Sequence, residues 1–233
     1  MPRDLSRMKL GCRYRGNSAT YGENAIKSNA EIPMAWSRIV GAPRVEGYND
    51  TIGDCVETAG FNAVQTQTAL GGNMTPIPNH LVPGVYSAVT GYNAANPVTD
   101  QGTDPEVFFT WWAQNAISGF RLSNIIRLNP KDESNIRDTI IRKGGVFLCV
   151  ELATQQQNEI IWTASGTPGS WGGHAVWCDG FEAELTFATS WGQVKPIDRS
   201  YFQQGFVVAA YGLELEGNPF SESSSTSGLS GRA

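Results

Sequence analysis

The chain has 233 residues and a mass of 25.2 kDa, which is enough for one sizeable hydrophobic core. Hydrophobic residues make up 40% and charged residues 17%, a composition that excludes general intrinsic disorder. The apolar runs are far shorter than the roughly 20 residues that a membrane-spanning helix needs, so we expect no membrane partner. The N-terminal residues contain no apolar stretch, so we expect no signal peptide.

The net charge of -5 is unevenly distributed. Five basic residues against one acidic residue give the first fifteen positions a net charge of +4, which leaves -9 for the other 218. Because a body that acidic does not attract polyanions over long range, no nucleic-acid partner is expected. Residues 1–31 are predicted to form a basic arm, either solvated or bound to an acidic partner. Residues 217–233 are predicted to form a Ser- and Gly-rich tail that is disordered alone.

The first half of the chain carries helical patterns. Asp54, with Glu57 three residues later, has the spacing of a capping box and precedes apolar residues at near-helical intervals, so we expect a helix from Asp54 to about Ala69. Further helices are predicted at about 79–91, at 104–118 and at 132–143. The 104–118 segment carries four aromatic residues that cover too much of its circumference for one face: Phe108, Phe109, Trp111 and Trp112. That helix is therefore predicted to lie between the core and a partner or groove.

The second half carries short β-prone runs separated by Gly, Pro and Asn. They lie at 145–152, 173–178, 185–189 and 205–211. Helices followed by strands, without βαβ alternation, predict an α+β fold with a mostly antiparallel sheet. We expect a helical lobe at about 45–130 and a β lobe at about 131–216.

Two residues far apart in sequence have the chemistry of a nucleophile and its base. Cys55 lies one residue inside the predicted helix N-terminus, where free N–H groups and the helix dipole stabilise a thiolate. The base has only two candidates, and His80 is predicted to be a surface residue. His174 follows Gly172 and Gly173, which let a backbone or ligand approach closely. Cys55 and His174 suit these roles, although a lone cysteine in a helix is more often a small buried hydrophobe.

The four cysteines lie at positions 12, 55, 149 and 178, without CxxC spacing. No disulfide framework is expected, and a reducing compartment, such as the cytoplasm, fits best. Cys12, Cys149 and Cys178 are interpreted as bystanders, with Cys149 in the core. Cys178 shares a strand face with His174, but no further Cys or His lies nearby to complete a metal site. We expect neither a metal nor a cofactor.

Four blocks agree in order and spacing with the papain-like cysteine peptidases over roughly residues 32–216. They are Ile32–Arg38, similar to the mature start; Asn49–Cys55, similar to the nucleophile block; Gly172–Val176 with Gly180-Phe181, similar to the histidine strand; and Thr189–Gly192, similar to Asn-Ser-Trp-Gly. The resemblance implies a papain-like fold in two lobes with the site between them. The runs 86–92 and 100–104 resemble short members encoded by tailed phages and bacteria.

The resemblance also implies a role for each residue of the site. Cys55 would attack a peptide or other amide bond, and His174 would accept and return the proton. Asn49 would hold the oxyanion together with the Cys55 N–H, its amide being a shorter equivalent of the family's Gln. Thr189 stands where the family has Asn and would orient the imidazole weakly, because it offers no planar amide. Trp191 would shield the histidine, and Gly172 and Gly173 would line the cleft.

Departures from the family pattern leave two functions open. Asp54 adds a negative charge that opposes formation of the Cys55 thiolate. Only about 31 residues precede the Ile32–Arg38 block, so zymogen control by a long pro-region is expected to be absent, which favours narrow specificity or no proteolysis. The first hypothesis is a cysteine hydrolase of phage or bacterial type that acts narrowly on a peptide or protein substrate. The second is a catalytically degenerate scaffold that serves as a structural, decoration or accessory protein of a phage particle and contacts neighbouring subunits through its arms.

Overall fold

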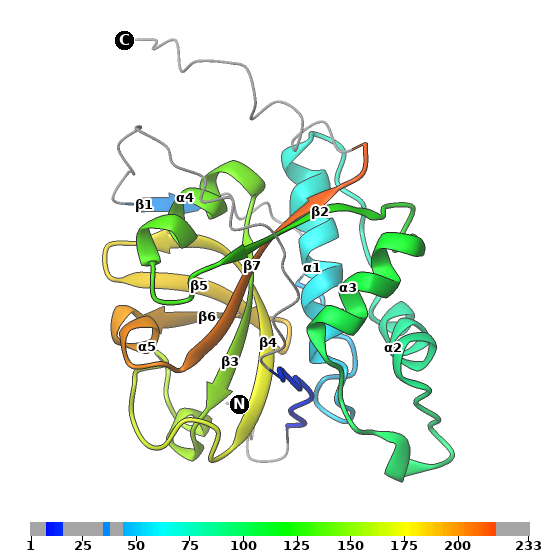
Figure 1. Ribbon diagram of the computed structural model, residues 1–233, viewed down its shortest axis with the longest axis horizontal. Helices are drawn as coiled ribbons and strands as arrows, with labels where there is room; N and C mark the ends of the chain where they lie inside the picture. The colour runs from blue at the N-terminus through cyan, green and yellow to red at the C-terminus, as the bar shows by residue number, and fades with distance from the viewer. Residues whose placement is uncertain (1–7, 16–34, 38–43, 218–233) are drawn as a thin grey trace.

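The computed structural model describes residues 8–15, 35–37 and 44–217, with the helices of residues 55–114 on one side of a curved sheet (Figure 1). This arrangement confirms the α+β fold with a helical N-terminal part and a β C-terminal part. Most of the predicted basic arm and nearly all of the predicted C-terminal tail lie outside the described residues. Within the described part of the chain, no helix is both long and apolar enough to cross a membrane.

The helices form close to their predicted positions. The α-helices are α1 (Cys55–Leu70), α2 (Val82–Thr90), α3 (Pro105–Gln114), α4 (Glu133–Lys143) and α5 (Arg199–Gln203); short 3-10 turns are η2 (Asn79–Leu81), η3 (Pro97–Thr99) and η4 (Thr154–Gln157). The helix predicted over 104–118 ends four residues early. There, Ile117 and Phe120 exchange backbone hydrogen bonds across Ser118 and Gly119, both of which have positive φ and so cannot continue a helix.

The capping box predicted at α1 is wrong. Asp54 occupies the N-cap position but makes no side-chain capping bond. Its carboxylate instead accepts hydrogen bonds from the Tyr48 N–H at 3.0 Å and the Thr58 hydroxyl at 3.4 Å. The Glu57 carboxylate accepts a hydrogen bond from the Thr103 hydroxyl at 2.7 Å. Tertiary partners have thus replaced the local pattern, because both carboxylates are buried and each needs a donor.

Seven strands make one sheet in the described part of the chain. They are β1 (Ala35–Ser37), β2 (Leu122–Leu128), β3 (Val146–Leu152), β4 (Gly172–Glu182), β5 (Leu185–Ser190), β6 (Gln193–Asp198) and β7 (Val207–Leu215). The order is β2-β7-β3-β4-β5-β6, with β1 beside β4, and every pair is antiparallel. The four predicted strands are confirmed, and β1, β2 and β6 are additional. Because β2 pairs with β7, the sheet begins at Leu122 instead of near residue 131.

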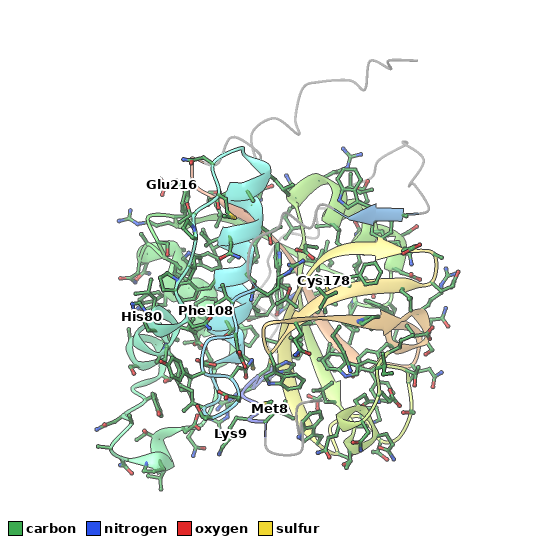
Figure 2. The ribbon with its side chains drawn as sticks, turned by 180° about the vertical axis from the view of Figure 1, so that it is seen from behind. Met8, Lys9, His80, Phe108, Cys178 and Glu216 are labelled. Carbon is green, nitrogen blue, oxygen red and sulfur yellow. The ribbon has the colours of Figure 1, made fainter. Side chains whose placement is uncertain are left out.

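The two faces of the sheet bury two separate cores. Side chains alternate along β4, so Ala175 and Trp177 face α1, whereas Val176 and Cys178 face the core covered by α4 and α5. Phe108, Phe109 and Trp112 of α3 are fully buried in the first core, and Trp111 is partly buried. Figure 2 shows Phe108 beside α1. The aromatic cluster of α3 is therefore largely core.

A buried ion pair connects the helices to the sheet. Asp179 on β4 is bound by both terminal nitrogens of Arg44, one of them, Nη2, at 3.2 Å from Oδ1, and it also accepts a hydrogen bond from Thr66 of α1 at 3.4 Å. Burial raises the pKa of the Asp179 carboxyl, and the arginine opposes that rise. The Thr66 hydrogen bond joins α1 to β4, on which the candidate site is built, and the ion pair joins the chain before α1 to the same strand.

Candidate active site

Cys55 is the first residue of α1, and its thiol is completely buried where this helix meets β4. Burial, the largest effect, raises the pKa of the thiol well above its ordinary value, and the nearby Cys12 adds to the rise. The backbone N–H groups of Ala175 and Gly11 face the sulfur and lower the pKa, but by less. The helix N-terminus alone therefore does not produce a thiolate here, because the sulfur is buried away from solvent.

His174 lies one residue before Ala175, and its side chain is also completely buried. Its Nε2 is 2.9 Å from the Ser190 hydroxyl, whereas Nδ1 has no hydrogen-bond partner among the described residues. The thiol lies in the core on the α1 face of β4, whereas the imidazole lies with Ser190, Trp162 and Trp191 on the opposite face, and the two are not hydrogen-bonded to each other. Burial lowers the pKa of the imidazole to about 3. In this arrangement both groups are neutral at pH 7.

Ser190, and not Thr189, is the residue that contacts the imidazole. Thr189 lies opposite Trp177 in the β4–β5 ladder, so its side chain points to the α1 face of the sheet. Its Oγ1 is buried and has no hydrogen-bond partner in the described structure. The next residue, Ser190, points to the opposite face and reaches His174. Because side chains alternate between the two faces of a strand, only one of the two hydroxyls can face the imidazole. Matching the motif by sequence does not show which one.

Trp191, expected to shield the histidine, lies against the imidazole. Its ring stacks on the imidazole, with centroids 4.6 Å apart and planes 16° from parallel. The Trp171 ring stacks on the Trp191 ring at a centroid distance of 5.6 Å. Trp191 and Gly192 form the two-residue hairpin between β5 and β6, with φ of 47° and 69°. Positive φ at both positions is what such a hairpin requires. The turn therefore places the indole over His174 and keeps water from it.

Asn49 lies in the turn before α1, and 2% of its surface is exposed. Its Oδ1 is buried without a hydrogen-bond partner among the described residues, and none of their hydrogen bonds joins Asn49 to Cys55. The oxyanion role expected for Asn49 is thus a prediction for a state with substrate bound. His80, expected at the surface, is exposed on η2, on the outer side of the helices (Figure 2).

Residues 8–15 of the same chain lie beside Cys55, between the helical part and β4, and the space that they fill is called the groove below. The Cys12 N–H donates to the Gly173 carbonyl at 3.1 Å, on the sheet side of the groove. On the helical side, the Thr103 N–H donates to the Gly11 carbonyl at 2.7 Å, and the Arg13 N–H donates to the Thr103 carbonyl at 2.9 Å. Figure 1 shows this dark-blue segment between β4 and the loop before α1, and Figure 2 shows Met8 and Lys9 at the same boundary. Part of the predicted basic arm is therefore bound to both lobes.

Glycines make this close approach possible. A Cβ atom on Gly11 would lie 2.0 Å from the Gly53 carbonyl oxygen, and one on Gly102 would lie 2.1 Å from the Gly11 oxygen. A Cβ atom on Gly173 would lie 2.3 Å from the Cys12 oxygen. These distances are impossible for real carbon–oxygen contacts, so the groove at this point admits bare backbone only. The close approach expected at Gly172 and Gly173 is that of residues Leu10 and Cys12.

A hydrogen-bond network ties the groove's helical wall to the nucleophile loop. The Asp100 carboxylate accepts from the Gly53 N–H at 2.9 Å and from the Tyr86 hydroxyl at 2.8 Å. The Tyr86 hydroxyl in turn accepts from the Gly102 N–H at 2.9 Å. These contacts hold Thr103 at a fixed distance from Cys55. The motif comparison included both runs but assigned no role to Tyr86, Asp100 or Thr103.

Two buried carboxyl groups lie close to the nucleophile. Burial raises the pKa of Glu57 to about 8 and that of Asp54 to about 7. At pH 7 Glu57 is therefore mostly protonated and Asp54 about half protonated, so the negative charge expected beside Cys55 is reduced. No set of three His, Cys, Asp or Glu side chains in the described ranges is placed to hold a metal ion.

The fold of this chain is that of papain-like cysteine proteases. Xylellain, a cysteine protease from Xylella fastidiosa, superimposes with a TM-score of 0.70 at 11% identity, over 92% of this chain and 98% of the other. Digestive procathepsin L 3 of Tenebrio molitor gives 0.65 at 16% identity, over 90% and 76%. Bromelain from Ananas comosus, in complex with the E64 inhibitor, gives 0.61 at 16% identity, over 79% and 100%. No family model and no curated protein matches the sequence.

Proposed function

We propose that this chain is a cysteine hydrolase that cleaves a peptide or amide bond in an extended polypeptide, with Cys55 as the nucleophile. One observation carries the proposal: the groove beside Cys55 binds an extended segment through backbone hydrogen bonds to Thr103 and Gly173. Main-chain hydrogen bonds of this kind recognise any extended peptide, and the neighbouring pockets decide its side chains. The papain-like fold supports the same reaction class.

In the proposed reaction the Cys55 sulfur attacks the carbonyl carbon, and His174 takes the thiol proton and then gives it to the leaving amine. Water hydrolyses the resulting thioester. The Cys55 N–H and the Asn49 amide stabilise the oxyanion. Ser190 fixes the imidazole through Nε2, and Trp191 covers it.

The reaction requires residues 8–15 to leave the groove. With the segment bound, burial raises the pKa of the Cys55 thiol and lowers that of His174, which disfavours the thiolate–imidazolium pair. Removal of the segment hydrates Cys55 and moves the pKa of its thiol back toward the ordinary range. The proposed reaction also requires the His174 side chain to turn so that its unbonded Nδ1 faces the sulfur. Residues 8–15 therefore act as a built-in competitor of substrate.

The shape of the groove supports narrow specificity. A substrate that follows the path of the bound segment must place a glycine where Gly11 lies, because a side chain there meets the Gly53 carbonyl. The hydrogen bond between Tyr86 and Asp100 joins the two runs that resemble short phage and bacterial members, which supports the proposal that this enzyme is of that type.

The test is covalent labelling of the full chain by E64 at neutral pH, located by peptide mass spectrometry. In a Gly11→Val variant, whose segment cannot dock, we expect one adduct, on Cys55, and turnover of glycine-containing peptides. Cys55→Ala removes both signals, and Cys178→Ala, a change on the other face of the sheet, retains them. Absence of a Cys55 adduct from the Gly11→Val protein would overturn the proposal.

A second candidate is a papain-like scaffold without activity, serving as a structural or accessory component of an assembly such as a phage particle. The observations that favour it are the missing hydrogen bond between Cys55 and His174 and the unbonded hydroxyl of Thr189. On this proposal the Gly11→Val protein neither reacts with E64 nor turns over peptide. Deletion of the basic arm or the tail then abolishes incorporation into the assembly.

A further inference from the structure

Three of the four cysteines meet in the groove. Cys149 lies close enough to Cys12 to raise the pKa of its thiol, and Cys12 is close enough to Cys55 to do the same there. All three belong to the same buried cluster on the α1 face of the sheet. Cys178 lies in the core on the opposite face. The sequence spacing gave no sign of this, because the three residues come from the N-terminal segment, α1 and β3.

Backbone contacts place Cys12 and Cys149 beside the same part of β4. Cys12 is anchored through its N–H to Gly173, and Cys149 lies directly opposite Ala175 in the β3–β4 ladder. Gly173 and Ala175 are two residues apart on one strand, so both cysteines reach the same short stretch of β4. Cys149 is fixed in a central strand, whereas Cys12 belongs to the segment that must leave for substrate to enter.

We propose that Cys12 and Cys149 are a disulfide-forming pair whose oxidation fastens residues 8–15 over the nucleophile. The cross-link would connect the covering segment covalently to the floor of the groove, so that Cys55 stays buried. In the reduced protein only hydrogen bonds and packing hold the segment. The consequence for catalysis rests on the proposed function, whereas the cross-link itself does not.

The chemistry needs an oxidant, which we take to be a low-molecular-weight disulfide such as oxidised glutathione. When the segment opens, the Cys12 thiolate attacks one sulfur of that disulfide, forming a mixed disulfide and releasing one thiol. As the segment closes, the Cys149 thiolate attacks the Cys12 sulfur, forming the Cys12–Cys149 bond and releasing the second thiol. The protein loses two electrons and two protons, and the small disulfide gains both pairs as two thiols.

Opening must precede oxidation, because neither thiol is accessible in the closed structure. The exposed fraction is 9% for Cys12 and zero for Cys149. Burial and the neighbouring Cys149 thiol raise the pKa of Cys12, which makes it a poor nucleophile until water reaches it. The rate of disulfide formation therefore depends on how often the segment opens. Once formed, the disulfide prevents further opening.

The experiment equilibrates the full chain in glutathione buffers from fully reduced to fully oxidised, quenches with acid and maps the cysteines by mass spectrometry. We expect a Cys12–Cys149 cross-linked peptide in the wild type and in a Cys178→Ala control. Iodoacetamide should alkylate Cys55 at least tenfold more slowly after oxidation in these two proteins. In Cys12→Ser and Cys149→Ala, oxidation should leave the Cys55 alkylation rate unchanged.

The wild-type map decides the proposal even if a variant fails to fold. A Cys12–Cys55 bond in place of Cys12–Cys149, or four free thiols at every buffer composition, would overturn it. If the Cys12–Cys149 bond forms and slows alkylation while no peptide is hydrolysed in any state, the disulfide stands and the proposed hydrolase fails.

Discussion

The Cys12 N–H donates a hydrogen bond to the carbonyl of Gly173, the residue immediately before His174, at 3.1 Å. A residue near the N-terminus is thereby joined to the backbone next to the candidate base, across more than half the chain. The same segment bonds to Thr103 on the other wall of the groove. This contact places residues 8–15 beside the buried Cys55, and the predictions below address it.

Gly11→Val should uncover the nucleophile. The new Cβ would lie 2.0 Å from the Gly53 carbonyl oxygen, a backbone atom that cannot move aside. We expect iodoacetamide to alkylate Cys55 at least tenfold faster than in the wild type under reducing conditions. Gly84→Val is the matched control, because a Cβ there meets no atom within 4 Å. An unchanged alkylation rate in Gly11→Val would show that the segment does not limit access.

Ser190→Ala and Thr189→Val should have different effects. Ser190 acts as a positioning residue through Nε2 of His174, so in the uncovered Gly11→Val protein its loss should lower kcat/KM about tenfold, or about 1.4 kcal/mol in barrier height. It should also shift the pH profile of kcat/KM, and Ser190→Thr should restore part of both. Thr189→Val removes a buried hydroxyl without a partner, so stability should stay equal or rise by about 1 kcal/mol. Equal losses from both changes would argue against this assignment.

Glu57→Gln should change how stability depends on pH. Burial raises the pKa of Glu57 from 4.5 to about 8, so the folded state binds more protons than the unfolded state between these values. The contribution of Glu57 is fully present below about pH 4.5 and is lost as the pH rises toward 8. The variant should therefore gain roughly 2 kcal/mol of unfolding free energy relative to the wild type between pH 5 and pH 7. Denaturant titrations at the two pH values measure the difference, and parallel curves would contradict it.

Arg44→Met should destabilise the protein by about 3 kcal/mol, because it leaves the buried Asp179 carboxylate without its cation. Thr66 alone offers a single, long hydrogen bond to that carboxylate. The double variant Arg44→Met, Asp179→Asn should recover a large part of the loss, since the uncompensated charge is gone. Urea unfolding of the two variants and the wild type supplies the comparison. A double variant no more stable than Arg44→Met would show that packing, and not charge, determines the loss.

Sequence patterns predicted the elements whose signals are local. Asp104 and Asp132 cap α3 and α4 through side-chain bonds to Glu106 and Asn135, and these helices begin where expected. The short apolar runs between Gly, Pro and Asn were also found, as β3, β4, β5 and β7. β6 was not predicted, because it is a polar edge strand interrupted by Pro196, which only an edge position tolerates.

The site itself depends on contacts that sequence does not encode locally. The positions of Cys55 and His174 followed from motif order. The choice of Ser190 over Thr189 depends on which face of β5 each residue occupies. The role of Cys12 depends on a segment that folds back across both lobes. Composition suggested a solvated arm, because basic residues dominate its charge. Gly11 and Cys12, which make the contacts with both lobes, do not stand out in the composition.

The covering segment and the groove belong to one polypeptide. The segment therefore competes with a free peptide as a tethered ligand. Residues 8–15 face the groove at the local concentration of a tethered ligand, on the order of millimolar for a flexible connection. A free peptide with the same intrinsic affinity must therefore exceed that concentration to occupy half of the molecules. Dissociation constants measured with added peptides will be weaker than the groove's own preference by this factor. The intrinsic affinity of the groove for a peptide should therefore be measured in a protein whose chain has been cleaved after the covering segment.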